Sequence, residues 1–133
     1  MLSQQELLEA SPIDYMNDDQ VEFFRHRLLT LCDEAEERLK SLKETLVGAP
    51  QEADSIDVAS SAAARERAQR LIARECDTIA QTRSALRRIR DGEFGYCGHT
   101  GEEIGLRRLI AQPTASFSVA AQERIERKRA QFA

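Results

Sequence analysis

Apolar residues recur between positions 21 and 46 at steps of three and four residues. The stripe consists of Val21, Phe24, Leu28, Leu31, Ala35, Leu39, Leu42 and Leu46. This spacing places one apolar face along a helix and approaches the heptad of a coiled coil. It predicts a helix that starts with Asn17 or Asp18 as its N-cap and ends before Gly48. Such a helix is about 45 Å long at about 1.5 Å per residue.

A second helical run extends from near Asp57 to Asp91-Gly92, where the glycine favours a left-handed C-cap. Its apolar stripe consists of Val58, Ala62, Ala68, Ile72, Cys76, Ile79, Leu86 and Ile89. Two runs of similar length joined by a short connection predict an antiparallel helical hairpin over residues 17–91. The small residues at the start of the second run predict a narrow tip at 48–59.

The two ends of the chain predict smaller elements. Residues 1–16 contain a short helix over about Ser3–Ala10, followed by a turn at Ser11-Pro12. Residues 93–115 are rich in glycine and predict a knot of loops, and a helical pattern resumes from Ser116 to Phe132. The candidate core of the loop region consists of Phe94, Tyr96, Ile104, Leu106, Leu109 and Phe117.

The charge argues against general nucleic-acid binding and differs between the two predicted helices. The net charge is −4, whereas phosphate neutralisation needs a basic surface. Residues 14–57 carry twelve acidic and five basic side chains (−7), and residues 58–90 carry three and eight (+5). The strip Arg65, Arg67, Arg70 and Arg74 is either a solvated face with exposed ion pairs or a surface for a partner.

The sequence also indicates in which cellular compartment the protein is expected. No apolar run approaches the about 20 residues of a membrane-spanning helix. The N-terminus lacks the basic start and apolar stretch of a secretory signal. Cys32, Cys76 and Cys97 are far apart and odd in number, which argues against a disulfide framework. We therefore expect a cytoplasmic monomer without membrane contact.

Two carboxylates, Asp54 and Asp57, stand three residues apart at the predicted tip. Either one is a favoured N-cap for the second helix, which explains one carboxylate better than both. The alternative is a charged tip that the two helices carry into a partner.

Four positions in the last 40 residues have the spacing of a zinc site. Cys97, Thr100, Ser118 and Ala121 follow an x2, seventeen-residue, x2 pattern, which with four cysteines would be a structural zinc site. A hydroxyl or a methyl is not a usual zinc donor, so we expect no metal, even with His99 or His26 nearby. Residues 92–133 therefore predict a small zinc-finger-like domain that lacks its metal and ends in a helix. Cys97 beside His99 also allows a redox or metal sensor, against the plainer interpretation of a packed thiol.

Several blocks together resemble the DksA family of bacterial transcription factors, in its zinc-independent paralogue type. The blocks are Tyr15-Met16-Asn17, Asp54-x-x-Asp57-x-Ala59, Phe94-Gly95-Tyr96-Cys97, Glu103-Ile104-Gly105, Arg107-Arg108-Leu109 and Pro113-Thr114-Ala115. The resemblance implies a mostly α fold: a coiled-coil hairpin (17–91) on a globular zinc-finger-like domain (92–133), with residues 1–16 packed on that domain. The chain departs from the family pattern, because it keeps only one of the family's four zinc cysteines, Cys97.

The resemblance implies a regulator without enzymatic activity or sequence-specific DNA binding, which enters the secondary channel of RNA polymerase and modulates initiation. Asp54, Asp57 and Ala59 would then act near the polymerase active site, and Arg74 would contact the polymerase rim. The family acts with the alarmone ppGpp. Here amides stand at basic positions of the family, Gln81, Gln112 and Gln122, so the ppGpp response stays open. A transcript-cleavage factor that uses the tip carboxylates to help hold magnesium is the alternative of the same class.

Overall fold

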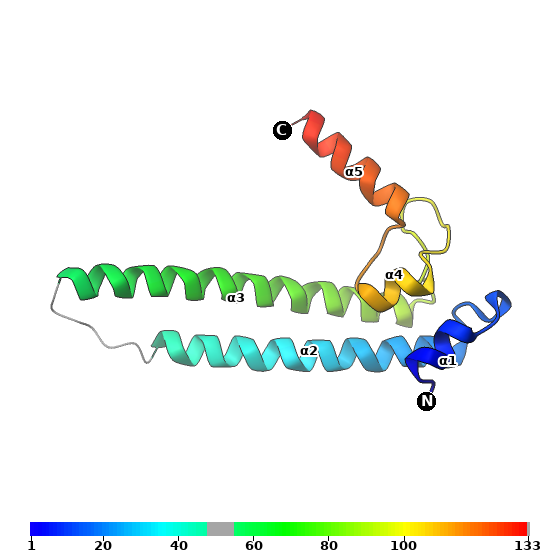
Figure 1. The fold of residues 1–133 in the computed structure, drawn as a ribbon, viewed down its shortest axis with the longest axis horizontal. Coiled ribbons are helices and arrows are strands. Elements are labelled where there is room, and N and C mark those ends of the chain that lie inside the picture. The colour runs from blue at the N-terminus through cyan, green and yellow to red at the C-terminus, as the bar shows by residue number, and fades with distance from the viewer. Residues whose placement is uncertain (48–54, 133) are drawn as a thin grey trace. The chain divides into compact units, whose positions relative to one another are not determined.

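A computed structural model describes residues 1–47 and 55–132, with the side chains of 55–58 excepted. Figure 1 shows a mostly helical chain in which α2 and α3 run side by side in opposite directions. Its elements are α1 (Gln4–Glu9), the 3-10 helix η1 (Pro12–Asp14), α2 (Asp18–Val47), α3 (Ser55–Arg90), α4 (Leu106–Ala111) and α5 (Val119–Gln131). The described residues contain one isolated β-bridge, between Tyr96 and Glu103. The predicted mostly α fold with a helical hairpin and a C-terminal helix is confirmed.

The ends of the two long helices follow the capping signals of the sequence. The side chain of Asn17 accepts a hydrogen bond from the backbone N–H of Gln20 at 2.9 Å, so Asn17 caps α2. At the end of α3, Gly92 has a φ of 75°, and the N–H of Glu93 donates to the Arg88 carbonyl at 2.8 Å. This left-handed turn stops the helix and satisfies one of its last carbonyls.

The described chain divides into two compact units. Unit 1 comprises Met1–Leu29 and Thr82–Ala133, and unit 2 comprises Thr30–Gln81. The boundaries predicted from sequence, at 16/17 and 91/92, both fall inside unit 1. Each long helix therefore contributes residues to both units, and the domain limits predicted from sequence stay a prediction.

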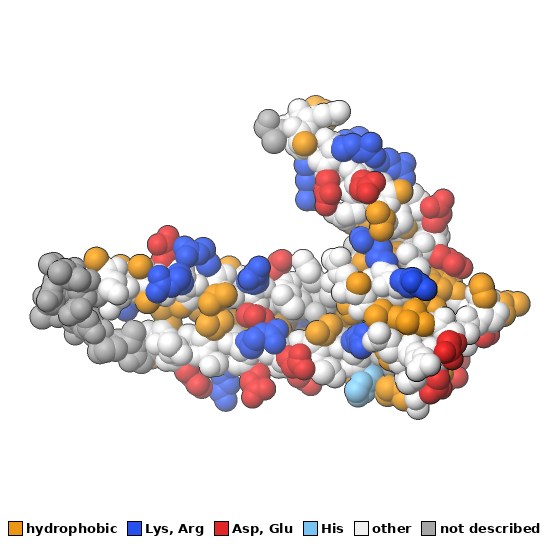
Figure 2. All heavy atoms as spheres, in the orientation of Figure 1, with side chains coloured by type: hydrophobic (Ala, Val, Ile, Leu, Met, Phe, Trp, Pro, Cys, Tyr) orange, Lys and Arg blue, Asp and Glu red, His pale blue; other side chains and the backbone are white. Residues whose placement is uncertain are grey.

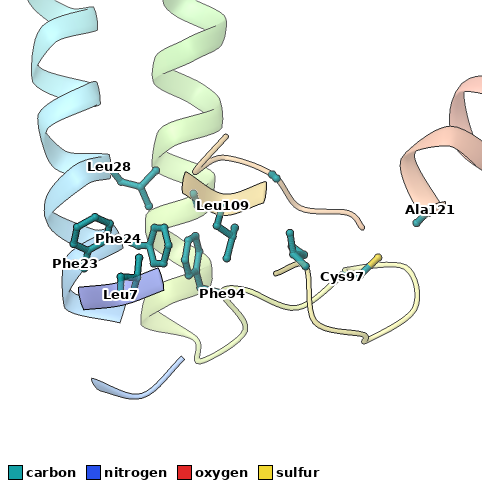
Figure 3. Close-up of a cluster of buried hydrophobic side chains, with 11 residues drawn as sticks. Leu7, Phe23, Phe24, Leu28, Phe94, Cys97, Leu109 and Ala121 are labelled. Carbon is teal, nitrogen blue, oxygen red and sulfur yellow. The ribbon is translucent and has the colours of Figure 1, made fainter. Parts of the chain in front are cut away.

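An aromatic core holds unit 1 together. Figure 3 shows Phe24 from α2 and Phe94 from the loop after α3 facing each other, with Leu7 from α1 and Leu109 from α4 beside them. The ring centroids of Phe24 and Phe94 are 5.5 Å apart. Phe24, Leu7 and Leu109 are fully buried. This one cluster therefore holds together α1, α2, α4 and the loop after α3.

Tyr15 fastens the start of the chain to the loop that follows α3. Its hydroxyl donates to the Gly95 carbonyl at 2.6 Å and accepts from the Gly105 N–H at 2.9 Å. Burial raises the pKa of Tyr15, which keeps the donating hydroxyl protonated. Met16 has a φ of 54° and lies so close that a Cβ on Gly95 would stand 2.6 Å from its Cγ. Gly95 itself has a φ of 92°, a left-handed conformation that favours glycine.

Unit 2 has a narrower interface between α2 and α3. Cys32 and Ala35 from α2 pack against Ile79 from α3, and Leu39 lies at the edge of this cluster. The predicted stripe of α2 is confirmed, since all of its residues are buried or partly buried. The predicted stripe of α3 is wrong at two positions, because Ala62 and Cys76 are exposed.

Two polar residues of α3 that are not part of the predicted apolar stripe are buried or nearly buried. Glu75 turns toward α2, where its Oε1 accepts from the Nε of Arg38 at 2.9 Å, and its side chain is 14% exposed. Thr82 is fully buried one heptad further on. In this ion pair the positive side chain, Arg38, comes from the net acidic helix, and the negative side chain, Glu75, comes from the net basic one. The pair therefore runs against the net charges of the two helices. Because Glu75 and Thr82 are polar, the spacing of apolar residues does not reveal that they are buried or nearly buried.

Two further expectations from the sequence need correction in unit 1. Residues 106–111 form a short helix, α4, where a knot of loops was predicted. Tyr96 is 38% exposed and packs edge-on against Tyr15, with ring centroids 5.7 Å apart, so it is not a core residue. None of the helices in the described residues is long and apolar enough to cross a membrane.

Candidate functional site

The residues of the predicted tip lie mostly outside the described part of the chain. Asp54 is not described. Asp57 falls in the first turn of α3, which begins at Ser55, but its side chain is not described. Ala59 is exposed on the same helix. The role predicted for this trio stays a prediction.

A basic groove runs along one face of α3 in unit 2. Arg67, Arg70, Leu71 and Arg74 line it, and its volume is about 430 Å³. The spacing of three, one and three residues places these side chains on one side of the helix over two turns. Figure 2 shows basic side chains gathered along this part of α3. Leu71 is 44% exposed among them, so an apolar contact is surrounded by three cations.

The four positions with zinc-site spacing are held in four different ways. Cys97 is 3% exposed. Burial raises the pKa of its thiol, but hydrogen bonds from the Thr100 hydroxyl and from the backbone of Ser118, His99 and Thr100 lower it, and the pKa falls to about 6. Protein donors thus surround the sulfur. This burial favours the interpretation of a packed thiol over a reactive one, because a reactive cysteine needs access to its reagent.

The other three positions are engaged in the fold of unit 1. Ser118 caps α5, because its hydroxyl accepts from the N–H of Ala121 at 3.2 Å. Ala121 is fully buried and belongs to the core cluster of unit 1, and Figure 3 shows it at the start of α5. Thr100 shields the Cys97 sulfur and also accepts from the N–H of Glu102 at 3.3 Å.

This donor set does not fit zinc. Structural zinc sites use four thiolate, imidazole or carboxylate ligands, whereas these positions offer one thiol, two hydroxyls and a methyl. His99 and His26 are both exposed, on a loop and on α2. The described residues hold no cluster of three or more His, Cys, Asp or Glu side chains that could bind a metal ion.

Gln81, Gln112 and Gln122, the three positions that bear on the expected ppGpp response, carry neutral amides. Gln81 donates to Asp77 at 3.1 Å, and Gln122 donates to Glu126 at 3.2 Å. Gln112 is exposed just after α4. These neutral side chains supply no positive charge for a phosphate.

The sequence patterns did not identify Tyr15 as a fastening residue or Glu75 as a partner of Arg38. A signal was present for Tyr15, because Tyr15-Met16-Asn17 and Phe94-Gly95 were both singled out as blocks. Their spacing in sequence gave no means to pair them.

Comparison with known proteins identifies the family. The profile described as "Prokaryotic dksA/traR C4-type zinc finger" matches residues 92–127. The chain is 45% identical over 118 residues to the RNA polymerase-binding transcription factor DksA of Caulobacter vibrioides, covering 86% of this chain and 81% of the relative. It is 31% identical over 124 residues to the protein of the same name from Escherichia coli K12, covering 90% and 80%.

A solved structure has the same fold. Transcription factor DksA2 from Pseudomonas aeruginosa matches with a TM-score of 0.86 and 36% identity over 96% of this chain and 99% of that one. The fold and these similarities define a helical-hairpin transcription factor, and the expectation of a protein that is not an enzyme is confirmed. The chain belongs to the DksA family.

Proposed function

We propose that this protein regulates transcription by binding RNA polymerase through the secondary channel and changing the stability of promoter open complexes. The observation that carries the proposal is the 45% identity to a relative named for polymerase binding, spread over 86% of the chain. The match therefore includes residues of both units. The helical hairpin is the element that enters the channel in this proposal.

The basic groove of α3 supplies the grip on polymerase. Arg74 contacts the polymerase rim, and the exposed Leu71 beside it gives this contact an apolar centre. Arginine suits such a contact because its planar guanidinium pairs with carboxylates in two parallel hydrogen bonds. An acidic, partly apolar surface is the complement of this groove.

The tip supplies the effect on initiation. Asp54 and Asp57 bring negative charge toward the polymerase active site, and Ala59 leaves room for close approach because its side chain is a single methyl. These residues act on elements of polymerase or on nucleic acid, and they catalyse nothing themselves.

The protein performs this role without zinc. The support is the donor set at Cys97, Thr100, Ser118 and Ala121, which fits hydrogen bonding and packing better than a metal. We further propose that it substitutes for a zinc-binding relative when zinc is scarce. Whether the protein acts together with ppGpp stays an open question in this proposal, since Gln81, Gln112 and Gln122 lack the charge that binds phosphates.

Replacing both Asp54 and Asp57 by Asn tests the proposed function. We expect the double variant to bind purified RNA polymerase core nearly as well as the wild type, because the gripping face is unchanged. Its effect on open-complex lifetime, measured in a promoter-decay assay, should be lost.

Two outcomes of this experiment would contradict the proposal. One is a double variant that regulates as well as the wild type. The other is a wild-type protein that does not bind polymerase, or that another channel-binding factor does not displace. Stimulated RNA cleavage in backtracked complexes would instead favour the transcript-cleavage alternative. A matched control is Arg74→Ala, which should weaken polymerase binding while leaving the tip intact.

A further inference from the structure

A cleft in unit 1 has no part in the function proposed above. It lies between the α1–η1 segment and residues 103–108, and its volume is about 500 Å³. Leu8, Pro12 and Leu106 give it apolar walls, and Arg107 and Arg108 lie along one side. A cleft of this size with apolar walls and few charges has the character of a binding site.

The walls of this cleft are already fixed in the free protein. Tyr15 lines it, and the two hydrogen bonds of the Tyr15 hydroxyl tie the N-terminal segment to Gly95 and Gly105. Beneath the cleft α1 packs against α4, with Leu7 and Leu109 fully buried. A partner would therefore not have to order the site when it binds, which removes one cost of association.

The apolar surface of the cleft is not needed by the core. In α1, Leu7 is fully buried, whereas its neighbour Leu8 is 43% exposed and lines the cleft. Ile13, at the adjacent turn of η1, is 90% exposed. Figure 2 shows hydrophobic side chains gathered where α1 and α4 lie, with basic side chains beside them. Apolar side chains grouped at the surface with charges around them mark a contact site for a partner.

The charges of the cleft select the kind of partner. Arg107 is exposed, and its guanidinium makes no hydrogen bond or ion pair with any residue that the structure describes. Arg108 is half-buried, and its Nε donates to the Phe117 carbonyl at 3.0 Å. Glu103 is the one acidic side chain among the lining residues, so positive charge is in excess by one. This suits a carboxylate next to an apolar side chain, and it is too little charge for nucleic acid.

We propose that this cleft binds a segment of RNA polymerase in which an apolar side chain stands beside an Asp or Glu. The apolar side chain contacts Leu8, Pro12 and Leu106, and the carboxylate pairs with Arg107. This inference rests on the proposed function, because that function names polymerase as the partner. It adds a second contact, made by unit 1, to the one that the groove of α3 makes in unit 2.

Two substitutions on opposite walls test the contact in the full-length protein. Leu8→Asp and Arg107→Glu should each weaken binding to purified RNA polymerase core about tenfold, as expected for central residues of an interface. Val119→Asp and Arg90→Glu are the matched controls, since these residues are also exposed but do not line the cleft. The controls should stay within about twofold of the wild type, the range of residues outside an interface centre.

A photo-crosslink identifies the occupant. With p-benzoylphenylalanine in place of Leu8, we expect a crosslink to a polymerase peptide that contains an acidic residue next to an apolar one. Adding Arg107→Glu should remove that crosslink.

Three results would overturn the inference: a crosslink to a second copy of this chain, a crosslink to a segment without acidic residues, or unchanged affinity in both cleft variants. If these appear while the wild type binds polymerase, the proposed function stands without this contact. If the wild type does not bind polymerase, the proposed function has failed first.

Discussion

The two units contain parts of the same two helices but build different interfaces from them. In unit 1, α2 contributes Phe24 and Leu28 to a fully buried aromatic and aliphatic cluster that also holds α1, α4 and the loop after α3. In unit 2, the interface narrows to Cys32, Ala35 and Ile79, with the Arg38–Glu75 pair beside them. The large core of unit 1 buries many side chains and so stabilises the fold. The small α2–α3 interface of unit 2 leaves most of the surface of these helices exposed. The comparison predicts that unit 1 contributes more to the stability of the fold than unit 2 does.

The largest effect should come from the core of unit 1. Phe24→Ala leaves a cavity among Leu7, Phe94 and Leu28 and should lower the free energy of unfolding by about 3–5 kcal/mol. Ile79→Ala in unit 2 should cost about 2 kcal/mol, because its surroundings are smaller and closer to solvent. Urea denaturation monitored by circular dichroism measures both. Equal losses in the two variants would refute the contrast between the units.

The next effect concerns the hydrogen bonds of Tyr15. Tyr15→Phe keeps the ring but leaves the Gly105 N–H and the Gly95 carbonyl without their partner, which should cost about 1–3 kcal/mol. Amide hydrogen exchange should rise at Gly105 more than at Ile79. If protection at Gly105 were unchanged in this variant, the hydroxyl would not be the group that fastens the N-terminal segment.

A smaller effect is expected for the ion pair of unit 2. Arg38 is half exposed, so a double-mutant cycle of Arg38→Met and Glu75→Gln should give a coupling energy below about 1 kcal/mol. The coupling energy should decrease further at high salt, because salt screens the attraction between surface charges. A coupling of several kcal/mol would mean that the seam of unit 2 depends on this pair, against its assignment as the weaker interface.

No effect at all is expected from removing metal. Thermal unfolding with and without a strong chelator should give the same midpoint, because the four positions of the zinc pattern are held by hydrogen bonds and packing. Metal analysis of the purified protein should find no stoichiometric zinc. A zinc-binding member of the family measured alongside is the control, and it should lose stability under chelation. A large drop in this protein's midpoint would overturn the zinc-free proposal.

Local signals in the sequence predicted the two long helices and one cap on each of them, but not α4. The three-four spacing from Val21 to Leu46 predicted α2, and Asn17 and Gly92 predicted caps that the structure confirms. These predictions succeed because helix periodicity and capping depend on neighbours a few residues apart. The motif blocks, taken in their order along the chain, also led to the correct family.

Tertiary structure decided the contacts between segments that are distant in sequence. Glu75 pairs with Arg38 of the other helix while the neighbouring Cys76 is exposed, and no residue close to Glu75 in the sequence indicates that partner. Tyr96 was predicted as a core residue but is 38% exposed, and its ring packs edge-on against Tyr15, a residue far away in the sequence. The cleft beside Leu8 arises in the same way, from two segments that only the fold brings together. Which side chains face one another depends on the packing of whole elements, and that information is not contained in any local pattern.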